Sequence, residues 1–176
     1  MTTRELDSEL FGRAVSFRYS EHWVAYAILG MRLVIGWTFF YAGITKVANP
    51  DWSVRGFLLY GIPEGNPFTS VWATMANDWA YILTPLNQVG LTLIGLGLMA
   101  GAFMRLSAVF GSLMMGFYWA AHFPHDNALI VSQHIVYILL LFGLGAFGAG
   151  RILGLDARLE KLSIVKRYPD LRLLLG

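Results

Sequence analysis

Long apolar stretches separated by short polar ones dominate the chain after its first 21 residues. Four of these stretches, at 23–47, 82–104, 106–123 and 128–150, contain no carboxylate. Each is close to the ~20 apolar residues that an α-helix needs to cross a ~30 Å hydrocarbon core. The pattern therefore predicts an all-α protein, an integral membrane four-helix bundle with four spans.

The four spans divide the chain into three parts. We expect an N-terminal segment at 1–21, a membrane domain at 22–150 and a basic C-terminal segment at 151–176. The first apolar stretch is longer than the core of a signal peptide, and no small-residue cleavage pattern follows it, so we expect it to remain uncleaved. Residues 156–165 have an amphipathic pattern, which predicts a helix resting on anionic lipids or docking to a partner.

The longest loop, at 48–81, contains a second amphipathic pattern. Its apolar residues recur at helical spacing, at Phe68, Trp72, Met75, Trp79 and Ile82. We expect a short helix in the outer membrane interface, where tryptophan is favoured. Asn66 would cap this helix and Pro67 would be its first residue.

The distribution of basic residues predicts the orientation. Ten Lys and Arg residues flank the spans on the side of the two termini, whereas Lys46 and Arg55 alone lie on the other side. Short loops rich in Lys and Arg stay in the cytoplasm. We therefore expect a multi-pass protein of the cell membrane with both termini cytoplasmic.

The composition excludes several classes of protein. Hydrophobic residues make up 56% of the chain and charged residues 14%, whereas a soluble domain carries about 25% charged residues. The chain has no cysteine, which excludes disulfides and cysteine-ligated iron–sulfur clusters. No nucleic-acid surface, phosphate-binding glycine loop or nucleophile–base pair is evident, so no catalytic residue is assigned.

Arg32 is the strongest single signal, because a charged side chain inside a span costs roughly 2.5–3.5 kcal/mol. It shares one helix face with Gly36, Gly43 and Lys46. Two roles stay open for Arg32. In the structural role, Arg32 bonds backbone carbonyls or extends to the inner membrane interface. In the ligand-binding role, it contacts an anion or a quinone. Its other possible partners are a second subunit or a polar side chain, such as Asn87, Gln88, Ser132 or Gln133.

Lys46 and the histidines offer further candidates. Lys46 is either an anchor at the outer boundary or part of a site on the Arg32 face. His134 and Tyr137, inside the fourth span, could relay protons or bond a quinone. A metal site is only weakly indicated, by His122, His125 and Asp126, because their spacing matches no metal signature. Exposed loop histidines and one hydrogen-bonded core histidine are the alternative.

Several motifs resemble the DoxX/DoxD family of small four-helix membrane proteins. The runs at 32–36 and 39–46, followed by a proline-rich outer loop, resemble the opening of that family. The glycine-rich stretch at 90–101, followed by Arg105, is similar to its second span and cytoplasmic turn. We expect these glycines to pack helices closely. The resemblance extends over roughly 28–150.

The family includes the DoxD subunit of archaeal thiosulfate:quinone oxidoreductase, which works with a DoxA subunit, and DoxX proteins linked to thiol redox complexes. The resemblance implies a membrane subunit of a quinone-linked oxidoreductase, with a thiosulfate dehydrogenase (quinone)-type activity, a quinone cofactor and a DoxA-like or respiratory partner. The alternative is a non-catalytic anchor or assembly subunit of a respiratory complex. A transporter or proton channel is less favoured, because no span holds a carboxylate. The candidate quinone- or substrate-binding residues are Arg32, Lys46, Gln88, Gln133, His134 and Tyr137.

Overall fold

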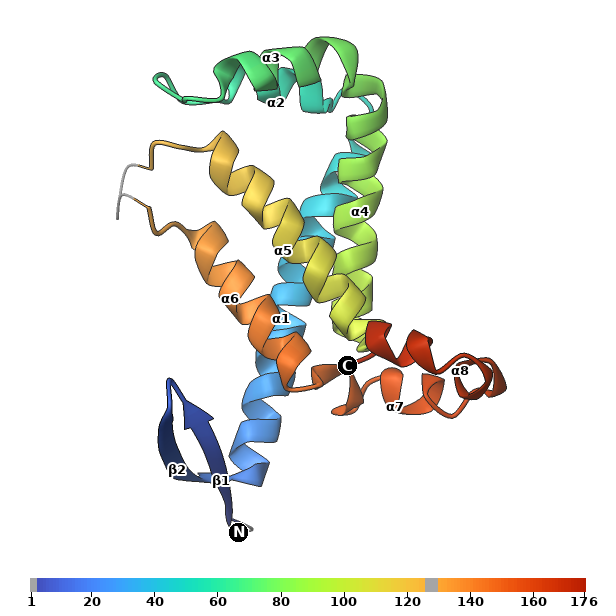
Figure 1. Ribbon diagram of the computed structural model, residues 1–176. Helices are drawn as coiled ribbons and strands as arrows, with labels where there is room; N and C mark the ends of the chain where they lie inside the picture. Colours follow the sequence, from blue (N-terminus) through green and yellow to red (C-terminus); the bar gives the residue numbers. More distant parts are fainter. Residues whose placement is uncertain (1–2, 126–129) are drawn as a thin grey trace.

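The computed structural model describes residues 3–125 and 130–176, and most of them are helical, as predicted. Four long helices form the body of the protein (Figure 1), namely α1 (Glu21–Ala48), α4 (Ala80–Ala100), α5 (Met104–Ala121) and α6 (Gln133–Ala146). Within the described residues, α1 and α4 are the two helices long and apolar enough to cross a membrane. Since α6 is apolar but has 14 residues, the four-span arrangement stays a prediction.

Short helices lie at both ends of the long ones (Figure 1). At one end, which we call the loop end, are α2 (Val54–Tyr60) and α3 (Thr69–Asp78). The opposite end, the C-terminal end, carries four short helices, namely η1 (Ala149–Arg151), α7 (Asp156–Leu159), α8 (Ser163–Arg167) and η2 (Pro169–Leu174).

Helix α3 falls on the amphipathic pattern of the long loop, whereas α2 was not predicted. The predicted helix start was wrong by two residues, because Phe68 is the N-cap. Asn66 instead accepts a hydrogen bond of 2.8 Å from the Phe68 backbone N–H. The predicted helix at 156–165 is interrupted where Leu162 adopts an extended conformation, so it forms two short helices.

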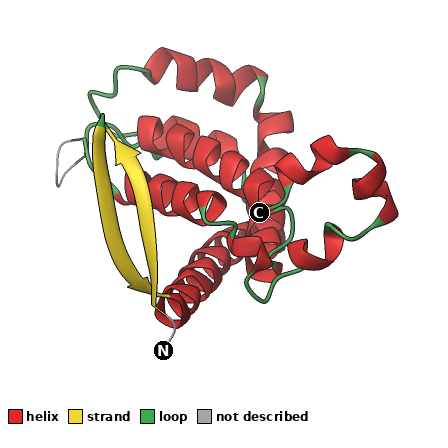
Figure 2. Ribbon diagram, turned by 60° about the horizontal axis from the view of Figure 1, so that its bottom comes forward, coloured by secondary structure: helices red, strands yellow, loops and turns green. Residues whose placement is uncertain are grey.

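Residues 3–20 form a β-hairpin, so the all-α prediction was wrong at the N-terminus. Strands β1 (Thr3–Leu10) and β2 (Arg13–Ser20) pair antiparallel (Figure 2). Side chains alternate between the faces of a strand, and Leu6 pairs with Phe17 on a face that is exposed. The strands are joined by Phe11 and Gly12, both with positive φ, as two-residue hairpin turns require.

Glycines let α1 and α4 approach backbone to backbone. A Cβ on Gly95 would collide with the Phe40 backbone, and one on Gly43 would collide with the backbone of Thr92. Small residues at such crossings allow helices to pack closely in lipid. Two of the predicted packing glycines, Gly90 and Gly97, face α5 instead, where an added Cβ would meet Met114 and Ser107.

Two hydrophobic clusters fill the interior. The larger lies among the long helices and is centred on nearly inaccessible residues, including Ile35, Phe39, Leu91, Leu98, Leu141 and Leu144. The smaller holds α2 and α3 against the ends of α4 and α5, and it includes Val54, Leu58, Trp72, Ala76 and Ala121. At the loop end, α2 and α3 therefore cover the ends of α4 and α5.

The α1–α4 contact predicts a position-specific effect of a single methyl group. Gly95→Ala should destabilise the protein by about 1–3 kcal/mol, because overpacking must move the backbone of α1. The matched change Gly143→Ala meets nothing within 4 Å and should stabilise by up to ~1 kcal/mol through helix propensity. Thermal unfolding in detergent measures both. Equal effects of the two changes would contradict the proposed backbone contact.

Candidate functional site

A cavity of about 330 Å³ lies near the loop end, between α1, α5, α6 and the loop that leads into α2. It brings together four of the six candidate binding residues, since its lining includes Lys46, Gln133, His134 and Tyr137. The other side chains around it are mostly aromatic or apolar, and they include Phe39, Trp52, Phe57, Leu91, Met115 and Tyr118. This combination of apolar walls and a few converging polar groups is typical of small-molecule sites.

Lys46 lies in the last turn of α1, which carries its ammonium to the cavity. Its Nζ donates hydrogen bonds to Asn87 Oδ1 at 3.0 Å and to Tyr118 Oη at 2.7 Å. The same nitrogen lies 4.7 Å from the centre of the Trp52 ring. Within the described chain, no carboxylate pairs with it. The charge is therefore hydrogen-bonded but not neutralised, which favours an anion or an electron-rich oxygen nearby.

Two side chains of α4 fix the position of Lys46. Asn87 also donates to Tyr118 Oη at 2.9 Å, which closes a three-membered network of lysine, amide and phenol. Gln88 does not line the cavity; its Nε2 donates to the Lys46 carbonyl oxygen at 3.0 Å. The sequence candidate Gln88 therefore holds the end of α1 rather than facing the cavity.

Three rings stack along the cavity wall. The centroids of His122 and His134 are 5.1 Å apart, and those of Tyr118 and His134 are 6.1 Å apart with planes 17° from parallel. His122 Nδ1 lies 2.8 Å from the Tyr118 carbonyl oxygen, and His134 Nδ1 lies 3.2 Å from Ser132 Oγ. Imidazole and phenol groups both exchange protons, and the Tyr118 and His122 centroids are 6.3 Å apart, so the stack places three such groups in a triangle.

The two described residues of the weak metal prediction, His122 and His125, pack against other rings. His122 belongs to the ring stack, while the His125 ring packs against Trp119 with 5.7 Å between centroids. Asp126 lies outside the described residues. Among the side chains that the structure describes, no three potential metal ligands gather.

Arg32 lies toward the C-terminal end, 14 residues before Lys46 in the same helix, or roughly 21 Å along its axis. Its side chain is 1% exposed. Its Nη1 donates to the carbonyl oxygens of Ala149 at 2.5 Å and Ile152 at 2.8 Å. Arg32 therefore does not line the cavity, and its contacts match the structural role that the sequence left open.

Asn66 is a positioning residue that the sequence analysis identified only as a cap. Its Nδ2 donates to the carbonyl oxygens at the end of α5, and its Oδ1 accepts from Trp72 Nε1 at 3.1 Å. One buried amide thus ties α3 to the end of α5. Tyr118, Trp52 and Asn87 were also missed as site residues. Two signals were available in the sequence. Asn87 is a polar residue inside a predicted span, and Tyr118 precedes His122 by four residues.

Comparison with known proteins assigns the chain to a family. The model of the family described as DoxX matches residues 27–123, more than half of the 176 residues, and this range runs from α1 to just beyond α5. No curated protein and no solved structure gives a significant match.

The contacts of Arg32 predict that its loss affects stability rather than the cavity. Arg32→Met should leave two buried carbonyls without their donor, at about 1–3 kcal/mol each. Arg158→Met, at an exposed position, is the control and should change stability little. Unfolding in detergent measures the difference. Iodide quenching of Trp52 in the cavity, isolated by subtracting the signal of Trp52→Phe proteins because the chain has six tryptophans, should be unchanged in folded Arg32→Met; a large change would contradict this assignment.

Proposed function

The chain belongs to the DoxX family of membrane proteins, and we propose that it is a membrane subunit of a quinone-linked oxidoreductase. The more specific form of the proposal is a DoxD-like thiosulfate:quinone oxidoreductase. The observation that supports it best is the un-neutralised Lys46 ammonium, which lies beside a Tyr118–His134–His122 ring stack in a cavity of small-molecule size.

The residues around this cavity suit the ring of a quinone. That ring is flat and apolar, with an oxygen acceptor at each end. The cavity offers flat aromatic walls and donors on Lys46 and Gln133. Its volume of about 330 Å³ is at the lower end of the ~300–1,000 Å³ of ligand pockets.

A bound quinone would supply the two-electron, two-proton chemistry. Lys46 and Tyr118 would hold an oxygen through charge-assisted hydrogen bonding, and Asn87 would keep the Tyr118 hydroxyl in place. His134 and His122 would hold and transfer protons at their ring nitrogens. Electrons would come from a sulfur anion such as thiosulfate or from a partner subunit, and the Lys46 charge would attract such an anion.

The proposed setting is the cell membrane, with four spans and both termini in the cytoplasm. The loop end would then face outward, with α2 and α3 at the outer interface. A DoxA-like or other respiratory subunit would be the electron-transfer partner.

A second candidate function is a non-catalytic anchor or assembly subunit of a respiratory complex. Two observations favour it. The donors of Arg32 are directed to carbonyls of the chain itself, and α1 exposes Trp23 and Tyr26 next to the hairpin, with 65% and 66% of their surfaces accessible. Exposed aromatic residues in such a position suit contact with another subunit.

The proposal predicts that quinone binding depends on Lys46. Loss of a hydrogen bond from a charged group costs about 1.5–3 kcal/mol, so Lys46→Gln should weaken binding roughly 10- to 100-fold. Tyr118→Phe should weaken it less, because a neutral hydroxyl is lost. The matched controls are Lys166→Gln and Tyr60→Phe, both at exposed positions. Binding is measured on protein purified in mild detergent, by quinone extraction and by titration.

Two results would decide against this function. One is a folded wild-type protein that binds no quinone while it co-purifies with stoichiometric respiratory subunits, which would support the anchor. The other is quinone binding that is equally strong in Lys46→Gln and Lys166→Gln.

A further inference from the structure

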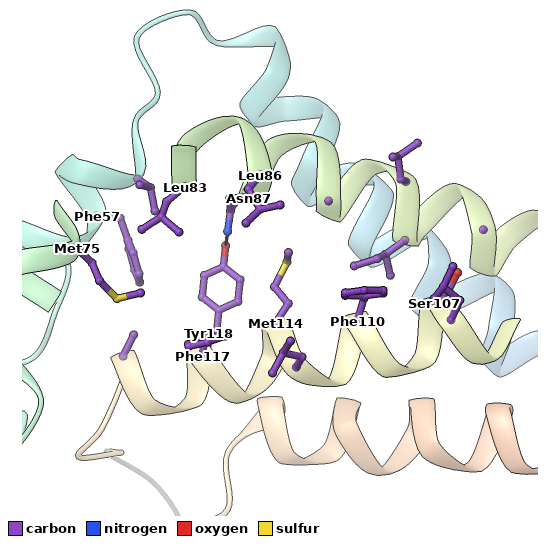
Figure 3. Close-up of a pocket in the computed structure, with 18 of the residues that line it drawn as sticks. Phe57, Met75, Leu83, Leu86, Asn87, Ser107, Phe110, Met114, Phe117 and Tyr118 are labelled. Atoms are coloured by element: carbon purple, nitrogen blue, oxygen red, sulfur yellow. Dashed lines mark hydrogen bonds between the residues drawn. The ribbon is translucent and has the colours of Figure 1, made fainter. Parts of the chain in front are cut away.

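A long apolar groove runs between α4 and α5 and includes Tyr118 in its lining (Figure 3). Its volume is about 680 Å³. The α4 wall extends from Leu83 to Gly97, which corresponds to roughly 21 Å of helix. The opposite wall is formed by α5, including Ser107, Phe110, Met114 and Phe117. A groove of this length follows most of α4.

The groove is almost entirely hydrocarbon. Among the residues that the structure describes, no charged side chain lines it, and polar side chains are few. Asn87 and Tyr118 lie toward the loop end, and Ser107 lies toward the other (Figure 3). The surroundings therefore suit an uncharged, extended hydrocarbon chain.

Two glycines on the α4 wall lie close to side chains of α5. A Cβ on Gly90 would lie 3.1 Å from Met114 Cε, and one on Gly97 would lie 2.5 Å from Ser107 Oγ. Bulky side chains at the rim remain about half exposed, with Leu93 at 61% and Phe110 at 53%. The groove is thus open sideways, toward the surface that the proposed membrane setting assigns to lipid.

The groove and the candidate quinone cavity share three lining residues, Val54, Phe57 and Tyr118. The Tyr118 hydroxyl is bonded to Lys46 of the cavity and to Asn87 of the groove. An aromatic side chain thus lies between a cavity with several polar groups, suited to a flat ring, and an apolar groove, suited to a chain. This arrangement matches the two parts of a prenylated ring compound.

We infer that the α4–α5 groove holds the isoprenoid tail of a quinone whose ring occupies the Lys46 cavity, with the tail passing Phe57 and Tyr118. The inference rests on the proposed function. It also implies lateral entry from the bilayer, because the rim of the groove is exposed along its length. Lipid tails are as apolar as the groove, so moving the isoprenoid tail from lipid into the groove gains no hydrophobic free energy. The groove therefore orients the tail by close packing.

Photo-crosslinking tests the groove separately from the ring site. The first probe is a benzoquinone with a prenyl tail that ends in a diazirine, and the second is the same ring with the photoreactive group but no tail. Gly90→Leu fills the groove. Gly116→Leu is the matched control, because a Cβ there meets nothing within 4 Å and the residue is outside the groove. Labelled peptides are mapped by mass spectrometry.

The tailed probe should label the α4 and α5 residues that line the groove, in the wild type and in Gly116→Leu. Gly90→Leu should reduce this labelling about tenfold, equivalent to roughly 1.4 kcal/mol, while the tail-less probe still labels the cavity. If Gly90→Leu does not fold, Leu93→Trp replaces it as the groove change and Leu139→Trp becomes the control. Both leucines are similarly exposed, and only Leu93 lines the groove.

Other results separate the possible failures. If the ring probe labels the cavity but tail labelling is unchanged in Gly90→Leu, the groove inference is overturned and the proposed function stands. If no ring probe labels the cavity, the proposed function fails. The groove is then tested alone with a diazirine-tagged prenyl alcohol. Labelling of the groove would preserve it as a prenyl-chain site, and absence of labelling would overturn the groove inference. Dissociation of a dimer by Gly90→Leu would identify the groove as an interface between copies and overturn the inference.

Discussion

Arg32 places a guanidinium in the interior of the protein, 1% exposed and without a carboxylate in direct contact within the described residues. The C-terminal segment meets this charge with carbonyl oxygens. Gly148 adopts a left-handed conformation with φ 64° just after α6, and the turn that follows presents the oxygens of Ala149 and Ile152 to Arg32. Asp156 then accepts hydrogen bonds from the backbone N–H groups of residues 103, 104 and 176. One buried charge thus joins α1 to a C-terminal segment that also caps α5.

The fixed position of Arg32 also affects the loop end, because α1 extends from Arg32 to that end. Arg32 and Lys46 belong to the same helix, about four turns apart, so the position of Arg32 also determines that of Lys46. Gly43 and Gly95 bring α4 into backbone contact with this helix. By contrast, α4 and α5 have side chains rather than backbone between them at Gly90 and Met114. One helix pair supplies a rigid frame, and the other leaves room for the groove.

The sequence predicted the helices better than it predicted the site. Apolar length and missing carboxylates were enough to find α1 and α4, and the cost of burying a charge was enough to single out Arg32. The sequence could not predict which carbonyl oxygens bond Arg32. Every residue has a carbonyl, and only the turn after α6 determines which of them lack a helical hydrogen-bond partner. Lys46 was open between anchor and site, because its hydrogen-bond partner Tyr118 lies 72 residues later in the chain and could not be identified from spacing. The hairpin was not predicted, because its apolar residues are few and charged residues are interspersed with them in 3–20.

The closed C-terminal end limits how the proposed site is reached. Arg32, Asp156 and Leu175 are each at most 1% exposed, so packed groups separate the cavity from that end of the protein. A ligand must therefore enter from the loop end or sideways between the helices. These two routes suit different chemistry: the loop end leads to the Lys46 charge, and the side of α4 and α5 is hydrocarbon. A charged electron donor and an apolar electron acceptor would then approach by separate paths, and Tyr118, which lines both the cavity and the groove, lies where these paths meet.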